Sequence, residues 1–343
     1  SFALLPPADL IARAKFSSRL LRNAQGRKNL LSFLAIQIRE ILLLFVPMYG
    51  GGMEIFMIKI TDVRVHTGDS AFLIDDGKTA ILYDSGFGFT GFGVAEKIKE
   101  EIGNRNLDYI FLTHSHYDHA LGSAYILEIW PDAKVVAGEY AAKIFAKDSA
   151  KAVMRDLDQK FAKKCGVESY KDLADNLRVD IPASDGDVIV AGDMEFEVIN
   201  LPGHTKCSVG FYNKKEKLLL GCESIGVYDG EGTVVPSYLV GVEMAIESIE
   251  KAEKLDIENI LVPHFGLLGK EDTKTYFANA KKNARETADE IIQILKSGKS
   301  REDAIEYFKN KFYKGYIKEV YPKDAMELNT GITVDLIKRE YEI

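Results

Sequence analysis

The chain from residue 56 onward consists of short apolar runs that are separated by turns and alternate with amphipathic stretches. Runs at 56–67, 70–77 and 78–86 are rich in Ile, Val, Leu and Phe and are bounded by Gly and Asp, which is typical of strands. The pattern then predicts a helix at 94–103 and a further strand at 107–112. This alternation of strands and helices predicts an α/β fold.

The same alternation is repeated further along the chain. A helix is predicted at 120–130, where Pro131 ends it. Three strands and one helix follow, in the order strand 194–202, strand 217–224, helix 245–255 and strand 257–263. The side chains that could bind a ligand come at the C-terminal ends of strands, where a rigid sheet can hold a loop in place.

Beyond residue 267 the pattern becomes helical. Apolar residues recur there at spacings of three and four, the period of an amphipathic helix, and they are Phe277, Ala280, Ala284, Ala288, Ile291 and Leu295. Ser300 followed by Asp303 predicts the cap of a second helix that continues through Tyr313. We therefore expect residues 268–343 to form a helical C-terminal extension, which could act as a lid or as the interface of a homodimer.

Residues 1–52 differ from the rest of the chain, because they carry seven Lys/Arg and only two acidic residues. A basic helix-like stretch is followed by an apolar one and by three glycines. Three interpretations stay open: a fused or upstream segment that is not native to the protein, an amphipathic membrane-surface or partner-binding helix, or a helical hairpin on the core. A transmembrane span is disfavoured because Arg39 and Glu40 interrupt the apolar run. Membrane contact is therefore expected only if this segment is native.

Charge and cysteine usage exclude some classes of protein. The whole chain has a net charge of −8, and residues 1–52 contribute +5, which leaves −13 for the remainder. Such an acidic body argues against a broad nucleic-acid surface, which needs clustered Lys and Arg. The three cysteines are far apart and form no CxxC pair, so a disulfide framework is disfavoured and a reducing, cytoplasmic location is predicted.

Histidine is concentrated in one loop. Three of the six histidines, His114, His116 and His119, lie within six positions together with Asp118. Neutral imidazole is the commonest protein ligand for zinc and iron, and a carboxylate helps to balance the charge of the ion. Such a loop can direct 114 and 116 toward one ion and 118 and 119 toward another, and a catalytic pair of metals about 3.5–4 Å apart needs two such sets.

The remaining histidines differ in context. His204 and His264 each follow an apolar strand, as the histidine loop does, and they are further candidate ligands. His66 lacks this context, and a lone histidine on a strand is more often structural, so it is not a candidate. The residues alone therefore predict a metal site at the ends of several strands.

Over residues 53–267 the chain resembles the metallo-β-lactamase superfamily, on the motifs Thr-His-Ser-His-Tyr-Asp-His and Pro-Gly-His-Thr. The resemblance implies a four-layer αββα sandwich with a metal site at one edge. It also implies two ligand sets, of which the first is His114, His116 and His204. The second set would be Asp118, His119 and His264.

The chain departs from the family pattern at the carboxylate that normally bridges the two ions. An Asp is usual there, but the strand at 217–224 contains Cys222 and Glu223. We expect Glu223 to be the bridging ligand, set one methylene further from its backbone, with the Cys222 thiolate as the alternative. Asp84 matches a family aspartate that supports the ligands from behind, although a turn residue is an equal interpretation. Cys207 is expected to be a small buried residue rather than part of the site.

This metal site predicts a hydrolase. Two divalent ions, Zn first and Fe or Mn as alternatives, would activate a bridging hydroxide that attacks an ester-like bond, with Asp118 orienting the hydroxide and accepting its proton. The helical extension resembles that of thioester hydrolases in the superfamily, so the expected substrate is a small-molecule thioester, ester or lactone. Tyr228 is a candidate pocket residue. A diiron redox enzyme, a phosphodiesterase and a binding protein on a metal scaffold stay open as alternatives.

Overall fold

The computed structural model describes residues 58–343, and the expectations for residues 1–52 lie outside the described part of the chain. The first of its two large sheets has its strands in chain order. These strands are β1 (Lys59–Asp62), β2 (Phe72–Asp75), β3 (Ala80–Tyr83), β4 (Tyr109–Leu112), β5 (Lys134–Gly138) and β6 (Ile181–Ala183). The pairs β1–β2 and β2–β3 are antiparallel, and the strands from β3 to β6 run parallel.

The second large sheet has the order β14-β13-β10-β9-β8-β7. Its strands are β7 (Val188–Ala191), β8 (Met194–Asn200), β9 (Val209–Asn213), β10 (Leu218–Leu220), β13 (Asn259–Val262) and β14 (Gly266–Leu267). All neighbouring pairs are antiparallel except β10–β13, which is parallel. A small separate sheet pairs β11 (Val227–Tyr228) with β12 (Val234–Val235).

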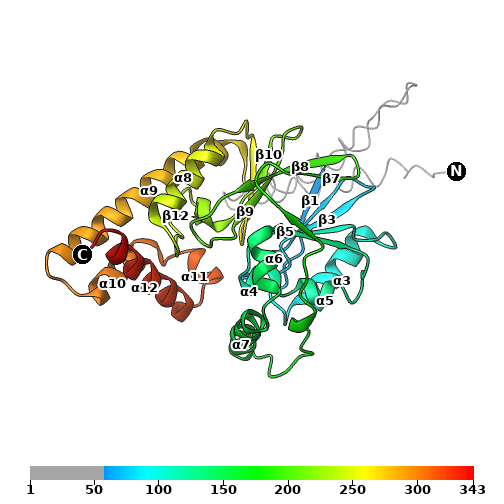
Figure 1. The fold of residues 1–343 in the computed structure, drawn as a ribbon, viewed down its shortest axis with the longest axis horizontal. Helices are drawn as coiled ribbons and strands as arrows, with labels where there is room; N and C mark the ends of the chain where they lie inside the picture. The colour runs from blue at the N-terminus through cyan, green and yellow to red at the C-terminus, as the bar shows by residue number, and fades with distance from the viewer. Residues whose placement is uncertain (1–57) are drawn as a thin grey trace, which may run out of the picture. The chain divides into compact units, whose positions relative to one another are not determined.

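Helices cover the outer faces of both sheets (Figure 1). Those that follow strands of the first sheet are α3 (Gly91–Ile102), α4 (Tyr117–Ala120), α5 (Ser123–Ile126), α6 (Glu139–Phe145), α7 (Asp148–Lys164) and the 3-10 helix η2 (Ala174–Asn176). The later ones are the 3-10 helix η3 (Glu223–Ile225), α8 (Val242–Glu253), α9 (Lys270–Lys296), α10 (Arg301–Phe312), α11 (Ile317–Val320) and α12 (Lys323–Glu340).

Three buried clusters confirm the predicted αββα layers. Alternate residues of β3 point to opposite faces, so that Leu82 packs against the helices of the first sheet while Ile81 and Tyr83 face the second sheet. Phe111 from the first sheet stacks on Phe211 from the second, with ring centroids 4.6 Å apart. The third cluster lies on the outer face of the second sheet, beneath α8 and α9. The sheets therefore share one core, and each has a second core under its own helices.

Of the helix predicted at 120–130, the structure forms only the short helix α5 (Ser123–Ile126), and the short helix α4 (Tyr117–Ala120) ends where the prediction begins. Gly122 lies at the junction, so close to the neighbouring loop that an added Cβ would be 1.9 Å from the carbonyl oxygen of Ser85. The backbone N–H of Gly122 also donates to the carbonyl of Gly86 at 3.0 Å. This tertiary contact interrupts the helix at Gly122, although the local sequence pattern favours a continuous one.

The C-terminal helices follow the predicted pattern. Of the six periodic apolar positions in α9, all except Leu295 are fully buried. The cap predicted from Ser300 and Asp303 is present as a capping box, in which the Ser300 hydroxyl accepts from the backbone N–H of Asp303. None of the helices in residues 58–343 combines the length and apolarity that crossing a membrane requires.

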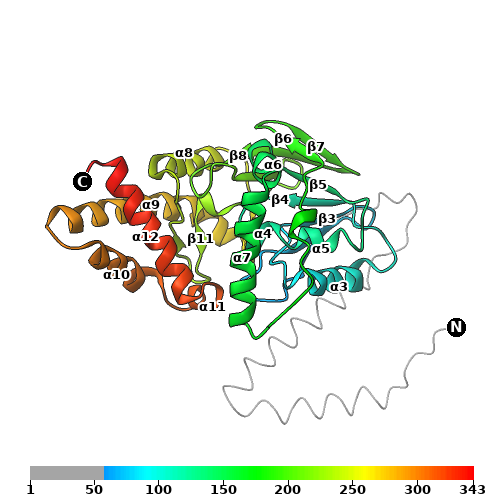
Figure 2. The same ribbon diagram turned by 60° about the horizontal axis from the view of Figure 1, so that its bottom comes forward.

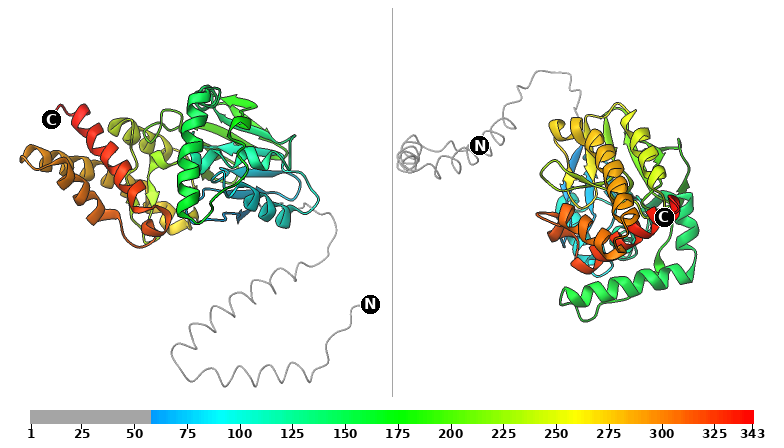
Figure 3. Two further views of the ribbon diagram at one scale, coloured as in Figure 1. Left: turned by 90° about the horizontal axis from the view of Figure 1, so that it is seen from below. Right: turned by 90° about the vertical axis from the view of Figure 1, so that its left-hand side faces the viewer.

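Helix α7 lies beside the segment formed by α11 and α12, as two views show (Figures 2 and 3). An ion pair between Lys164 of α7 and Asp324 of α12 joins the two elements. The extension at 268–343, predicted as a lid or an interface, thus meets a helix that belongs to the first sheet.

Candidate metal centre

The seven candidate ligands are brought together at one edge of the sandwich, where strands of both sheets end. His114, His116, Asp118 and His119 follow β4, the last two within α4. From the second sheet, His204 follows β8, Glu223 follows β10 and His264 follows β13. Five of the seven are fully buried, namely His114, His119, His204, Glu223 and His264.

The carboxylate of Glu223 lies at the centre of the cluster. Its Oε2 atom is 2.8 Å from Nε2 of His204 and 3.4 Å from Nε2 of both His114 and His119. Its Oε1 atom is 3.4 Å from Nε2 of His264. One carboxylate therefore contacts four imidazoles, which come from three different strand ends.

The donor atoms form two groups, and within each group all of them lie within 4.8 Å of one another. The first group holds His114, His116, His204 and Glu223, and the second holds Asp118, His119 and His264. The second group is looser, since Oδ2 of Asp118 is 3.6 Å from Nε2 of His119 and 3.9 Å from Nε2 of His264. Together with Glu223, which reaches both groups, this arrangement matches the division implied by the family resemblance.

The cluster suits divalent cations. Among residues 58–343, the Nε2 atoms of His114, His119 and His264 are buried without a hydrogen-bond partner. Buried polar atoms of native proteins nearly always have a partner, because an unpaired one costs about 1–3 kcal/mol. Nitrogen and carboxylate oxygen are the donors that zinc and iron accept. One cation in each group would satisfy these nitrogens, that of His114 in the first group and those of His119 and His264 in the second.

Each buried imidazole is held from behind through its other nitrogen. Nδ1 of His119 lies 2.7 Å from Oδ2 of Asp84, and Nδ1 of His114 lies 3.0 Å from the Thr113 hydroxyl. Nδ1 of His204 lies 2.9 Å from the carbonyl oxygen of Ser237. Such partners fix the ring orientation and leave Nε2 free to bind a cation.

Asp84 is the principal supporting residue. Its buried carboxylate accepts hydrogen bonds from the Ser70 hydroxyl at 2.8 Å and from the Thr113 backbone N–H at 2.9 Å, in addition to its contact with His119. Asp84 has a φ of 50° and His264 a φ of 64°. Such strained backbone in non-glycine residues is concentrated at functional sites, where the surroundings hold it in place. Asp84 therefore acts as more than a turn residue.

The surroundings favour neutral imidazoles at His114 and His116 and a charged carboxylate at Glu223, whereas the pKa of His119 is raised, despite its burial, by the neighbouring aspartates. Burial and the neighbouring His204 lower the pKa of His116 to about 3. Burial and adjacent imidazoles also hold the pKa of His114 well below its usual range. Burial alone would raise the pKa of Glu223, but the surrounding histidines keep it well below the ordinary value. The imidazole lone pairs of His114 and His116 and the negative charge of Glu223 are thus available to a cation at neutral pH.

We expect Asp84→Asn to weaken metal binding by about 10- to 100-fold, the usual cost of losing a partner behind a ligand. Asparagine tolerates a positive φ, so the backbone strain is unchanged and the effect reports the lost charge. Titration of the metal-free variant with Zn²⁺ measures this change. Asp76→Asn, which alters a turn carboxylate that accepts from Thr79, is the control. Equal affinity in both variants would contradict the supporting role.

A cavity of about 340 Å³ opens onto the cluster. At its inner end lie His116, Asp118, His204 and Glu223. Its walls are α7 on one side and the segment from Val320 to Ile332 on the other, and the side chains there are mostly apolar. Lys160 and Lys164 of α7 also line the cavity, each in an ion pair with an aspartate, Asp156 and Asp324 respectively. The site is therefore reached along a largely apolar channel whose lysines are neutralised by ion pairs.

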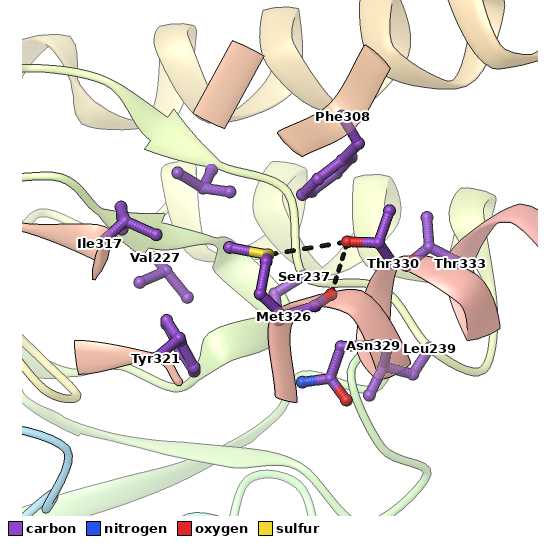
Figure 4. Close-up of a pocket in the computed structure, with 11 residues that line it drawn as sticks. Val227, Ser237, Leu239, Phe308, Ile317, Tyr321, Met326, Asn329, Thr330 and Thr333 are labelled. Carbon is purple, nitrogen blue, oxygen red and sulfur yellow. Dashed lines mark hydrogen bonds between the residues drawn. The ribbon is translucent and has the colours of Figure 1, made fainter. Parts of the chain in front are cut away.

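A second, smaller cavity of about 30 Å³ lies behind Tyr321, among residues of the C-terminal helices (Figure 4). Tyr321, Leu239 and Asn329 line both cavities. The Tyr321 hydroxyl donates a hydrogen bond of 2.5 Å to Oε1 of Glu223. This contact between the helical extension and the cluster was not predicted, because the sequence around Tyr321 has no motif that marks it.

The other residues singled out in the sequence lie outside the cluster. Cys222 is buried, and its thiol points toward the carbonyl oxygen of Leu201 at 3.8 Å. The side chain that reaches the cluster from this segment is therefore that of Glu223 and not that of Cys222. Cys207 is buried, as expected. Tyr228 packs edge-to-face on Phe265 in the core and does not line the cavity. His66 packs against Phe161, with ring centroids 5.3 Å apart.

Comparison with known proteins adds a family and several relatives. The family model described as the metallo-beta-lactamase superfamily matches residues 67–264. The chain is 26% identical over 167 residues to the acyl-coenzyme A thioesterase MBLAC2 of Gallus gallus, covering 46% of this chain and 57% of that protein. It is 29% identical over 151 residues to glyoxylase B2 of Dictyostelium discoideum, covering 42% and 47%. The chain thus spans about half the length of these two relatives.

One further hydrolase and one solved structure also resemble the chain. The hydroxyacylglutathione hydrolase GloC of Haemophilus influenzae is 24% identical over 167 residues, covering 47% of this chain and 68% of that protein. Among solved structures, the metallo-beta-lactamase family protein TTHA1429 of Thermus thermophilus superposes with a TM-score of 0.53 at 17% identity, covering 79% of this chain and 88% of the other. At this identity the likeness shows the fold alone.

Proposed function

Because this chain belongs to the metallo-beta-lactamase superfamily, we propose that it is a hydrolase with two divalent metal ions that cleaves a small-molecule thioester or a related ester. One ion would be held by His114, His116 and His204 and the other by Asp118, His119 and His264. The observation that carries the proposal is the central carboxylate of Glu223, which contacts imidazoles of both groups. Among residues 58–343, three of the imidazoles that it contacts have a buried Nε2 without a hydrogen-bond partner.

The ions would supply Lewis acidity and would lower the pKa of a bound water toward neutrality. The chain itself supplies the group that handles the proton. Asp118 lines the cavity, and its side chain keeps 18% of its surface exposed, so it faces the place where substrate and water meet. Burial raises the pKa of Asp118, which makes its carboxylate a better proton acceptor. Asp118 is therefore the proposed general base.

The shape of the cavity favours a thioester that has an apolar acyl group. Leu157 and Phe161 of α7 face Leu328 and Ile332 of α12 across the channel. An alkyl chain placed there would bury apolar surface at about 0.8 kcal/mol per methylene. The relatives named as an acyl-coenzyme A thioesterase and a hydroxyacylglutathione hydrolase support the same class of bond.

The proposal is tested by assaying the metal-loaded full chain on one panel of substrates. The panel holds acyl thioesters of several chain lengths, oxygen esters, lactones and a phosphodiester, each with Zn²⁺, Fe²⁺ or Mn²⁺. We expect thioesters to be hydrolysed fastest and Zn²⁺ to support the reaction. Oxygen uptake with the iron-loaded protein and no hydrolysis of any member would instead identify a redox enzyme. Preference for the phosphodiester would replace the proposed substrate class.

The apolar channel makes a separate prediction. Leu328→Glu should raise KM for a long-chain acyl thioester by about tenfold, because a carboxylate in the wall removes roughly 1.4 kcal/mol of apolar contact. KM for the acetyl thioester should stay within about twofold, since a short acyl group does not reach the position. Val188→Glu is a matched control, because Val188 is an exposed apolar residue on β7 and does not line the channel. Equal changes for both chain lengths would contradict acyl binding between α7 and α12.

A further inference from the structure

We infer that Tyr321, in the helical extension, positions the carboxylate of Glu223 between the two metal groups. The inference rests on the proposed function, since it assigns a role within the same site. Tyr321 lies outside residues 67–264, the part of the chain that matches the family. If the inference holds, the extension contributes directly to the metal centre, in addition to forming a wall of the cavity.

The geometry of the carboxylate shows what needs to be positioned. The two oxygens of Glu223 face different partners, with Oε2 2.8 Å from Nε2 of His204 and Oε1 3.4 Å from Nε2 of His264. The Tyr321 hydroxyl donates to Oε1 at 2.5 Å. Rotation of the carboxylate away from this orientation would break the hydrogen bond, so Tyr321 keeps Oε1 toward His264 while Oε2 faces His204.

A glutamate needs such a partner more than an aspartate does. Its side chain has one additional rotatable bond, and ordering each long side chain costs up to about 2 kcal/mol of rotamer freedom. Glu223 begins the short 3-10 helix η3, three residues after the end of β10. The carboxylate at the end of the longer side chain is not fixed by the backbone. The phenol therefore supplies a constraint that a shorter ligand would not require.

Tyr321 is itself held in place. Its backbone carbonyl accepts a hydrogen bond from the Tyr313 hydroxyl at 3.1 Å. Its ring packs edge-to-face on His264, with centroids 5.5 Å apart. Pro322 follows as the N-cap of α12 and limits the backbone at the junction with α11. Tyr321 lines both the larger cavity and the small one that Figure 4 shows. The direction of the hydroxyl is thus determined before any ligand binds.

The hydrogen bond is compatible with a loaded site. A carboxylate oxygen has two lone-pair positions, so Oε1 can accept from the phenol and still bond to a cation. Hydrogen-bonded partners of this kind commonly account for about 10- to 100-fold in metal affinity. Removal of the phenol hydroxyl should therefore weaken the ion nearest to His264 and Oε1 more than the ion held by His114, His116 and His204.

The test is a calorimetric titration of the metal-free full chain with Zn²⁺. We expect two ions to bind to the unaltered protein, and we expect Tyr321→Phe to weaken one of them by about tenfold or more while the other changes little. Titration with Co²⁺ gives a second measurement, because the absorption spectrum of the affected ion should shift. Tyr341→Phe is the matched control, since the Tyr341 hydroxyl donates to an exposed glutamate, Glu243, at 3.0 Å.

A double-mutant cycle separates positioning from a structural effect. In a Glu223→Asp background the carboxylate is one methylene further from the phenol, so adding Tyr321→Phe should have little effect on either ion. An equal loss in both backgrounds, or unchanged titration and Co²⁺ spectra in Tyr321→Phe, would overturn the inference while leaving the proposed function in place. Failure of the unaltered protein to bind two ions would overturn both.

Discussion

Replacing Asp118 with alanine is expected to lower kcat/KM of the metal-loaded protein by about 10³-fold, with little change in folding. General base catalysis alone accounts for about 10²- to 10⁴-fold, and the same carboxylate would also be lost as a ligand near His119 and His264. The side chain is partly exposed to the cavity, so its truncation leaves no void in the core. Steady-state kinetics on the best thioester, together with circular dichroism, measure both quantities.

Two control variants show whether the loss of activity comes from the charge of the Asp118 carboxylate. Asp156→Ala removes an exposed carboxylate of α7 that pairs with Lys160, and we expect kcat/KM to remain within about twofold because such surface pairs contribute little. Asp118→Asn keeps the shape of the side chain and removes its charge, and it should resemble the alanine variant. If Asp118→Ala turns over substrate at the unaltered rate, the assigned role of Asp118 is wrong.

Removing the metal ions is expected to abolish turnover and to lower the melting temperature. An ion that binds only the folded state at 1,000 times its Kd stabilises that state by about 4 kcal/mol. For a chain of this size, such a change corresponds to a shift of about 6 °C. In the metal-free protein, three buried imidazole nitrogens are left without a hydrogen-bond partner in the described part of the chain.

Differential scanning calorimetry with and without a chelator measures the shift, and back-titration with Zn²⁺ should restore both the melting temperature and the activity. Addition of Mg²⁺ serves as the control, because Mg²⁺ prefers an octahedral set of oxygen ligands and should restore little. Identical melting temperatures for chelated and metal-loaded protein would show that the cluster does not bind ions in the folded state.

The metal cluster could be predicted from sequence because its signal is local. Four of the seven candidate ligands lie between His114 and His119, and His204 and His264 each follow a recognisable apolar strand. The layers of the fold followed from the alternation of strands and helices together with the family resemblance. Glu223 was preferred to Cys222 as the expected bridging ligand because a carboxylate can bridge two ions. The structure places the Glu223 carboxylate in the cluster.

The features that escaped prediction depend on contacts between distant segments. The break between α4 and α5 arises where Gly122 meets Ser85. The sequence pattern of 120–130 cannot predict this contact, because Ser85 belongs to a distant segment. The cavity requires α7 and α12 to face each other, and α12 was not among the predicted elements. Tyr321 reaches Glu223 only because α11 and α12 fold back onto the edge of the sandwich. Local patterns identify ligands and elements, whereas the walls of a site follow from tertiary packing.

The most direct test of the central claim is anomalous X-ray scattering from crystals of the metal-loaded protein. The account predicts two peaks about 3.5–4 Å apart. One peak should lie at bonding distance from the nitrogens of His114, His116 and His204, the other near Asp118, His119 and His264, and the Glu223 carboxylate should contact both. A single ion, or peaks away from these side chains, would contradict the dinuclear hydrolase proposed here.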